Sequence, residues 1–126
     1  MTTIDERISE LEPTQPALDS ITTQDELDEF RNDNKYLIVD ATATWCGPCQ
    51  RIKPKILQMS QYYPHIKFTI CDIEEEECPI ADFVTVLPTF LIYKDGQLEE
   101  KIEGADIVSL MNIVKTLDEE IIQELL

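Results

Sequence analysis

Basic residues are scarce in this chain: among its 126 residues, 10 Lys and Arg stand against 26 Asp and Glu, for a formal net charge of −16. A surface of that sign repels phosphate backbones and anionic membranes at long range, so we expect neither a nucleic-acid partner nor a membrane partner. The acidic clusters at 25–29 and 72–77 are interpreted first as solvated surface. Their functional interpretation is electrostatic steering toward a basic partner.

Long hydrophobic runs are also absent, because no apolar stretch approaches the roughly 20 residues of a membrane-spanning helix. The opening MTTIDERISELEPTQPALDS has no apolar core of the kind a signal peptide needs, and its acids argue against a transit peptide. We therefore expect a cytoplasmic protein. Its size predicts one domain, residues 18–126, preceded by an N-terminal extension over 1–17 that is expected to lie outside the core and to be partly disordered.

The spacing of apolar residues predicts alternating strands and helices. Strands are expected at 36–39 (YLIV), 66–71, 89–93 and 98–102, and helices at about 23–32, from 47 to about 63, briefly within 78–83, and after Gly104. The predicted order is β, α, β, α, β, short α, β, β, α, which places one further strand before the first helix. This order implies parallel crossovers followed by an antiparallel hairpin. The predicted fold class is therefore α/β, with a central mixed β-sheet flanked by helices on both faces. The Met and Ile residues of the last helix, among them Met111, are expected in the core.

Cysteine is limited to four positions, Cys46, Cys49, Cys71 and Cys78, and the first two lie in WCGPC, residues 45–49. In a reducing compartment such a C-x-x-C pair is more typical of catalysis or metal binding than of a structural disulfide. All four sulfurs together could form a tetrahedral zinc site. We favour redox chemistry and expect no metal, because Gly-Pro between the cysteines suits the turn at the start of a helix.

Three residues are candidates for that chemistry. Cys46 stands where a helix is expected to begin, and the free backbone N–H groups there favour a thiolate, so it is the candidate nucleophile. Cys49, one turn further on and expected to be more buried, is placed to attack the resulting mixed disulfide. Asp40 ends the apolar run YLIV, where burial would raise its pKa. We expect Asp40 to act as a general base that accepts the proton of Cys49, directly or through water.

The segment LIVDATATWCGPC, Pro54, the later LPTF at 87–90 and Gly104 before the last helix together resemble the thioredoxin family over about residues 18–123. The resemblance implies the thioredoxin fold and the same roles for Cys46, Cys49 and Asp40. It also implies a cis peptide bond before Pro88. The docking face that it implies for substrates consists of Trp45, Gly47, Pro48, Leu87, Pro88, Gly104 and Ala105.

The same resemblance implies a protein disulfide reductase that maintains cell redox homeostasis. Such a protein acts as a monomer on disulfide-containing proteins and needs no bound cofactor, because the dithiol carries both electrons. Its electron donor would be thioredoxin reductase, an NADPH-dependent flavoprotein. Two alternatives remain: a disulfide oxidase or isomerase, and a binding module that holds a partner on its acidic face.

The chain also differs from the family pattern. Ala41-Thr42-Ala43 stands where aromatic residues are usual, Ile70 stands where many members carry a lysine beside the buried Asp, and FVTVLP is one residue shorter than the usual stretch. These differences bear on substrate range and on how the pKa of Asp40 is tuned.

The remaining cysteines receive a structural interpretation. Cys71 lies in a strand pattern and is expected to be a buried core thiol. Cys78 follows the acidic run and is expected to be exposed, where it could form a regulatory disulfide or a mixed disulfide with a partner. Nearby carboxylates would raise its pKa and slow that reaction, so we favour the absence of a regulatory role.

Overall fold

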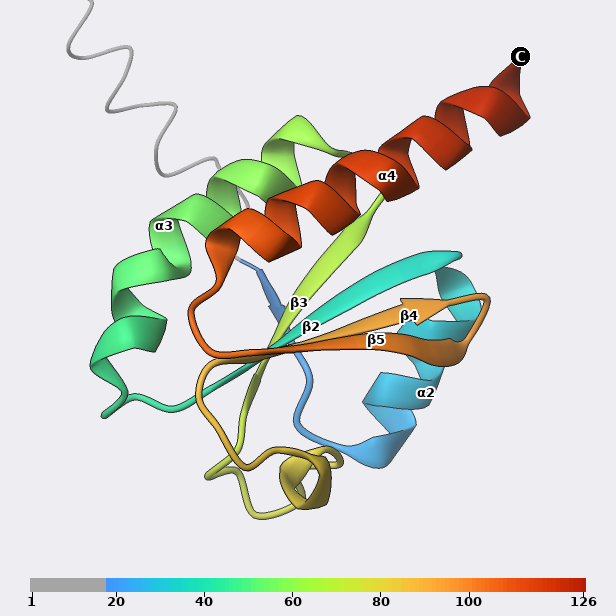
Figure 1. Ribbon diagram of the computed structural model, residues 1–126. Helices are drawn as coiled ribbons and strands as arrows, with labels where there is room; N and C mark the ends of the chain where they lie inside the picture. The colour runs from blue at the N-terminus through green and yellow to red at the C-terminus, as the bar shows by residue number, and fades with distance from the viewer. Residues whose placement is uncertain (1–17) are drawn as a thin grey trace, which may run out of the picture.

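A five-stranded mixed sheet runs through the computed structural model, which describes residues 18–126 (Figure 1). Its strands are β1 (Asp19–Ser20), β2 (Tyr36–Thr42), β3 (Lys67–Asp72), β4 (Thr89–Lys94) and β5 (Gln97–Glu103), in the spatial order β1-β3-β2-β4-β5. β1, β3 and β2 pair in parallel, whereas β4 pairs antiparallel with both β2 and β5. The predicted α/β class and the predicted terminal hairpin are confirmed. The predicted extension over 1–17 lies outside the described residues.

Helices cover both faces of this sheet. They are α2 (Gln24–Asp33), α3 (Gly47–Tyr62) and α4 (Ile107–Leu125), with a short 3-10 helix η1 (Ala81–Phe83) between β3 and β4. α3 and α4 lie together on one face, and α2 and η1 lie on the other (Figure 1). Within this part of the chain no helix combines the length and the hydropathy that a membrane crossing requires.

β2 is the central strand, and all seven of its residues are buried. Its side chains alternate between the two faces. Ile38 packs in the core formed with α3 and α4, and Leu37 and Val39 pack in the core on the side of α2. Asp40 is two residues after Ile38 on the strand, so its side chain points to the same face, the one that α3 covers.

The predicted strand over 36–39 is three residues too short at its carboxyl end, because β2 continues through Asp40 to Thr42. Ala41 and Thr42 continue the parallel pairing, opposite Cys71 and Asp72 of β3. A charged residue marked the apparent end of the apolar run, but ladder hydrogen bonds do not depend on side-chain polarity. Asp40 consequently sits inside the sheet rather than at its margin.

Local signals fix the ends of the elements that flank the site. Thr23 caps α2, its Oγ1 accepting the N–H of Glu26 at 3.2 Å, and Glu26 in turn accepts the N–H of Thr22 at 3.2 Å. The two contacts form a capping box whose return bond comes from Thr22 instead of the N-cap residue Thr23. In α4 the buried side chains are Leu110, Val114, Leu117 and Ile121. Met111 is 43% exposed and Ile122 is 48% exposed, so their predicted places in the core are wrong.

Candidate active site

Cys46 and Cys49 lie at the start of α3, where Cys46 is the N-cap residue and Cys49 is in the first turn. They are joined in a disulfide with their Cα atoms 5.3 Å apart. The backbone N–H of Cys49 donates to Cys46 Sγ at 3.2 Å. Both residues are buried, with exposed fractions of 5% and 2%. When the pair is reduced, this donor and the positive end of the helix dipole stabilise negative charge on Cys46.

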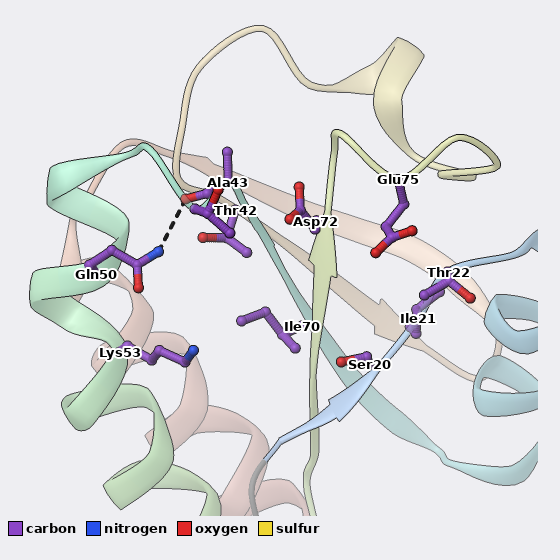
Figure 2. A pocket seen from close by; sticks show the side chains of 11 residues that line it. Ser20, Ile21, Thr22, Thr42, Ala43, Gln50, Lys53, Ile70, Asp72 and Glu75 are labelled. Carbon is purple, nitrogen blue, oxygen red and sulfur yellow. Dashed lines mark hydrogen bonds between the residues drawn. The ribbon is translucent and has the colours of Figure 1, made fainter.

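The turn that leads from β2 into α3 is held by the carbonyl of Ala43. This oxygen accepts the backbone N–H of Cys46 at 3.1 Å. It also accepts the side-chain amide of Gln50 at 3.1 Å, the hydrogen bond drawn in Figure 2. Ala43 itself is fully buried against Cys46 and Cys49. Ala43, the last residue of the segment that differs from the family pattern, therefore packs in one cluster with the two cysteines.

A cavity of about 360 Å³ lies beside the disulfide, and we call it the disulfide groove. Its lining consists of Trp45, Cys46, Gly47, Pro48, Ile73, Val84, Thr85 and Leu87. Trp45 is 65% exposed, and its indole N–H donates to the carboxylate of Glu74. The groove therefore leads from the solvent to Cys46, whereas Cys49 is not part of its lining.

The predicted docking residues fall into two groups in the structure. Trp45, Gly47, Pro48 and Leu87 line the groove. Pro88, Gly104 and Ala105 do not line it. The Leu87–Pro88 bond is cis, and the carbonyl of the buried Pro88 accepts the N–H of Gly104 at 2.8 Å. Gly104 has a φ of +88°, which favours glycine, so it supports the loop of Pro88, and Ala105 is exposed next to it.

Sequence reasoning missed three residues of the groove. Ile73 arrives from the end of β3, and Val84 and Thr85 arrive from the loop after η1. Their sequence surroundings carry no motif. The paired ends of β2 and β3 could have suggested Ile73, because parallel strands bring their carboxyl ends to one edge of a sheet.

Asp40 is buried with an exposed fraction of 1%, and its Oδ1 has no hydrogen-bond partner among the described residues. Burial raises the pKa of this carboxyl to about 7, and the positive charge of Lys53 opposes the rise. The carboxyl is therefore poised to exchange a proton near neutral pH.

Lys53 comes from α3 and was not singled out by the sequence. It lines a second cavity, of about 290 Å³, together with Thr42 and Ile70. Figure 2 shows the side chain of Lys53 extending from α3 toward Ile70, below Gln50. Ile70 is the register partner of Asp40 on β3. The positive charge that many relatives place on that strand is therefore supplied here from the helix.

The alternative of a zinc site gains no support from the structure. Across residues 18–126 no three His, Cys, Asp or Glu side chains gather in a geometry that could hold a metal ion. Cys46 and Cys49 are instead bonded to each other at the helix start.

Comparison with known proteins finds similarity to thioredoxins over most of the chain. A family model described as Thioredoxin matches residues 19–119. Thioredoxin-3, mitochondrial, of Saccharomyces cerevisiae is 41% identical over 111 residues, which cover 82% of this chain and 84% of that protein. A thioredoxin of Geodia cydonium is 38% identical over 84 residues, covering 65% of this chain and 79% of that protein.

Solved structures give the same result for the fold. The oxidised form of mitochondrial thioredoxin 3 from Saccharomyces cerevisiae superposes with a TM-score of 0.75 at 36% identity, covering 79% of this chain and 94% of that one. A Plasmodium falciparum thioredoxin superposes with a TM-score of 0.73 at 33% identity, covering 79% of this chain and 98% of that one.

Proposed function

The chain belongs to the thioredoxin family and is a thiol-disulfide oxidoreductase that reduces protein disulfides, and from this premise we propose that Cys46, Cys49 and Asp40 carry out the reaction in separate roles. The observation that carries this proposal is the position of Cys46 at the N-cap of α3, where its sulfur accepts a backbone N–H. Its consequence is a first cysteine that ionises more readily than an ordinary thiol.

In the first step the Cys46 thiolate attacks one sulfur of a substrate disulfide. A bond forms between Cys46 Sγ and that sulfur, the substrate S–S bond breaks, and the departing thiolate takes a proton from solvent. The disulfide groove orients the substrate for this attack, with Trp45, Gly47, Pro48 and Leu87 in contact with it. Pro88, Gly104 and Ala105 form the rest of the proposed docking face, in which the backbone of Leu87 pairs with an extended substrate segment.

In the second step Cys49 loses its proton and attacks Cys46 Sγ. The substrate sulfur leaves as a thiolate that takes a proton from solvent, and the Cys46–Cys49 disulfide remains. Asp40 accepts the proton of Cys49, because its pKa of about 7 suits it to both protonation states and its Oδ1 is unpartnered. Water that enters the cavity lined by Lys53, Thr42 and Ile70 reaches the register partner of Asp40, which is Ile70, and the side chain whose charge acts on Asp40, which is Lys53.

The cycle closes when two electrons restore the dithiol, and we assign this step to thioredoxin reductase, an NADPH-dependent flavoprotein. A further solved structure similar to this chain concerns the thiol resolving mechanism in yeast mitochondrial 1-Cys peroxiredoxin via glutathione/thioredoxin systems. That relative supports oxidised cysteines of other proteins as the substrate class. We propose that the protein is a monomer located in the cytoplasm. Because the yeast relative is named as mitochondrial, the mitochondrion is the alternative location, and cell fractionation distinguishes the two.

A trapping experiment tests the two cysteine roles. The Cys49→Ser variant, reduced and then mixed with a peptide that contains one disulfide, should accumulate a mixed disulfide at Cys46. The Cys46→Ser variant, treated in the same way, should form none at Cys49. Peptide mapping by mass spectrometry locates the adduct, and accumulation of an adduct on Cys49 in the Cys46→Ser variant would reverse the assignment.

A further inference from the structure

The two cysteines outside the active site lie beside each other. Cys71 Sγ, at the end of β3, is 3.4 Å from Cys78 Sγ in the loop that follows. Two successive turns make this approach: Glu75 N–H donates to the carbonyl of Asp72 at 3.1 Å, and Cys78 N–H donates to the carbonyl of Glu75 at 3.1 Å. Cys71 is buried and Cys78 is half-buried, so one sulfur of the pair reaches the surface.

We propose that Cys71 and Cys78 form a second, reversible disulfide that closes under oxidising conditions and weakens substrate binding in the disulfide groove. The sulfurs must move from 3.4 Å to ~2.05 Å, which is a displacement of side chains and of a surface loop rather than of the sheet. The inference rests on the proposed function of Cys46 and Cys49, because it concerns the regulation of their groove.

The reaction requires an oxidant, and a low-molecular-weight disulfide is sufficient. The Cys78 thiolate attacks one sulfur of that disulfide, whose S–S bond breaks to release the first small thiol. Cys71 then loses its proton and attacks Cys78 Sγ, which releases the second small thiol. The oxidant takes up two electrons, and the two protons lost by the cysteines end on the two small thiols.

Closure should be slow compared with oxidation of the active-site pair. Burial raises the pKa of the Cys71 thiol, and its hydrogen bond with Cys78 and the charges of Asp72 and Glu75 raise it further. A thiol with a raised pKa is a poor attacking group at neutral pH. The second disulfide should therefore form during sustained oxidation and not during each catalytic turnover.

Shared packing connects this pair to the groove. Ile73 and Leu87 pack against the apolar cluster that contains Cys71, and the same two residues pack against Cys46 and Cys49. Both also line the groove. The ends of the parallel strands β2 and β3 bring the Cys71 loop to the edge of the sheet where α3 begins (Figure 1).

Closure of the second disulfide draws this loop toward β3. Ile73 lies in the loop, and so does Glu74, which accepts the indole N–H of Trp45. Ile73, which lines one side of the groove, and Glu74, which holds the indole of Trp45, therefore move together. We expect the second-order rate constant for substrate reduction to fall about threefold to tenfold, the range for losing one good interface contact.

The first experiment tests closure apart from activity. In the full-length Cys46→Ser/Cys49→Ser protein, only Cys71 and Cys78 can react, and the probe is a series of buffers with increasing ratios of oxidised to reduced glutathione. We expect a species lighter by two hydrogens and resistant to alkylation at both cysteines, which dithiothreitol restores. The same protein carrying Cys78→Ser should show no such species. Two alkylatable thiols at every ratio, or a glutathione adduct at Cys78 that never resolves, would overturn the proposal.

The second experiment tests the coupling in the protein with its active-site pair intact. Wild type and Cys78→Ser are incubated at an oxidising glutathione ratio, their active-site pairs are reduced by thioredoxin reductase and NADPH, and reduction of a disulfide peptide is followed. Wild type should lose threefold to tenfold in its rate constant and recover with dithiothreitol, whereas the variant should not change. Equal rates after verified closure would overturn the regulatory part. Absence of activity in fully reduced wild type would instead refute the proposed function.

Discussion

Asp40 of β2 is paired in register with Ile70 of β3, so the buried carboxyl of the site has a hydrocarbon side chain as its neighbour on the adjacent strand. The positive charge that acts on Asp40 comes from another element, from Lys53 of α3. A carboxyl in this position is more easily protonated than one with a lysine beside it on the sheet, and its titration should be visible in both stability and activity.

Stability should depend on pH through Asp40. The pKa of this carboxyl rises from its ordinary value of 3.8 to about 7 in the folded protein, so the folded state holds the proton more tightly than the unfolded chain. The protonated Asp40 therefore contributes to the free energy of unfolding. This contribution is fully present below pH 4 and is lost as the pH rises to about 7, a change on the order of 4 kcal/mol. Asp40→Asn should remove the dependence.

Urea unfolding of both oxidised proteins between pH 4.5 and pH 8 measures this effect. The free energy of unfolding of Asp40→Asn, relative to wild type, should increase over this interval. Because the buried amide has its own desolvation cost, the test is the slope with pH and not the value at one pH. Parallel curves for the two proteins would show that Asp40 does not titrate in this interval.

Resolution of the mixed disulfide should slow in the same variant. Without a base, Cys49 deprotonates less readily, and we expect Asp40→Asn to lower the rate constant of substrate reduction about tenfold to a hundredfold at neutral pH. Stopped-flow measurement of thiol release separates the first attack, which should be unchanged, from resolution, which should be slow. An equal loss in both steps would indicate a general distortion of the site.

The pKa of Asp40 should rise when the charge of Lys53 is removed. Lys53→Met takes away the charge that lowers this pKa, so the pH at which Asp40 releases its proton should move above 7. A carboxyl NMR titration measures it directly. Lys55→Met, which removes an exposed charge from the same helix without acting on Asp40, is the matched control. Identical titrations in all three proteins would refute the role of Lys53.

Substrate docking should depend on Trp45. This side chain is 65% exposed and lines the groove, so Trp45→Ala should weaken binding and lower the rate constant about threefold to tenfold with little change in unfolding free energy. Tyr62→Ala removes an aromatic side chain that is 76% exposed and lines no part of the groove. Calorimetric binding of a substrate-derived peptide to both variants compares them, and an equal effect of both changes would argue against the groove.

The cysteine motif, the helix that follows it and the buried carboxyl were predictable because their signals are local. Cys46 and Cys49 are separated by one turn of helix, and Asp40 belongs to the same strand-to-helix unit. Lys53 was not predictable in the same way, because its relation to Asp40 depends on how α3 packs against the sheet. The apposition of Cys71 and Cys78 depends on two tight turns within an acidic run that carries neither Gly nor Pro.

Sheet pairing explains two further differences. The apolar run ended at a charged residue, yet the ladder with β3 carried β2 on to Thr42. Ile73 enters the groove because its N–H donates to the carbonyl of Thr42 at 3.0 Å, directly beyond the last pair of that ladder. Both facts concern the partner strand, about which the residues of β2 alone carry no information.

The carbonyl of Ala43 receives two donors, the backbone N–H of Cys46 and the side-chain amide of Gln50. Neither contact involves a sulfur atom. The scaffold that presents Cys46 is thus tethered independently of the bond that electron transfer makes and breaks. The oxidised and reduced proteins should therefore present nearly the same backbone conformation to their partner proteins. Only the state of the sulfur atoms would then distinguish the electron donor from the electron acceptor.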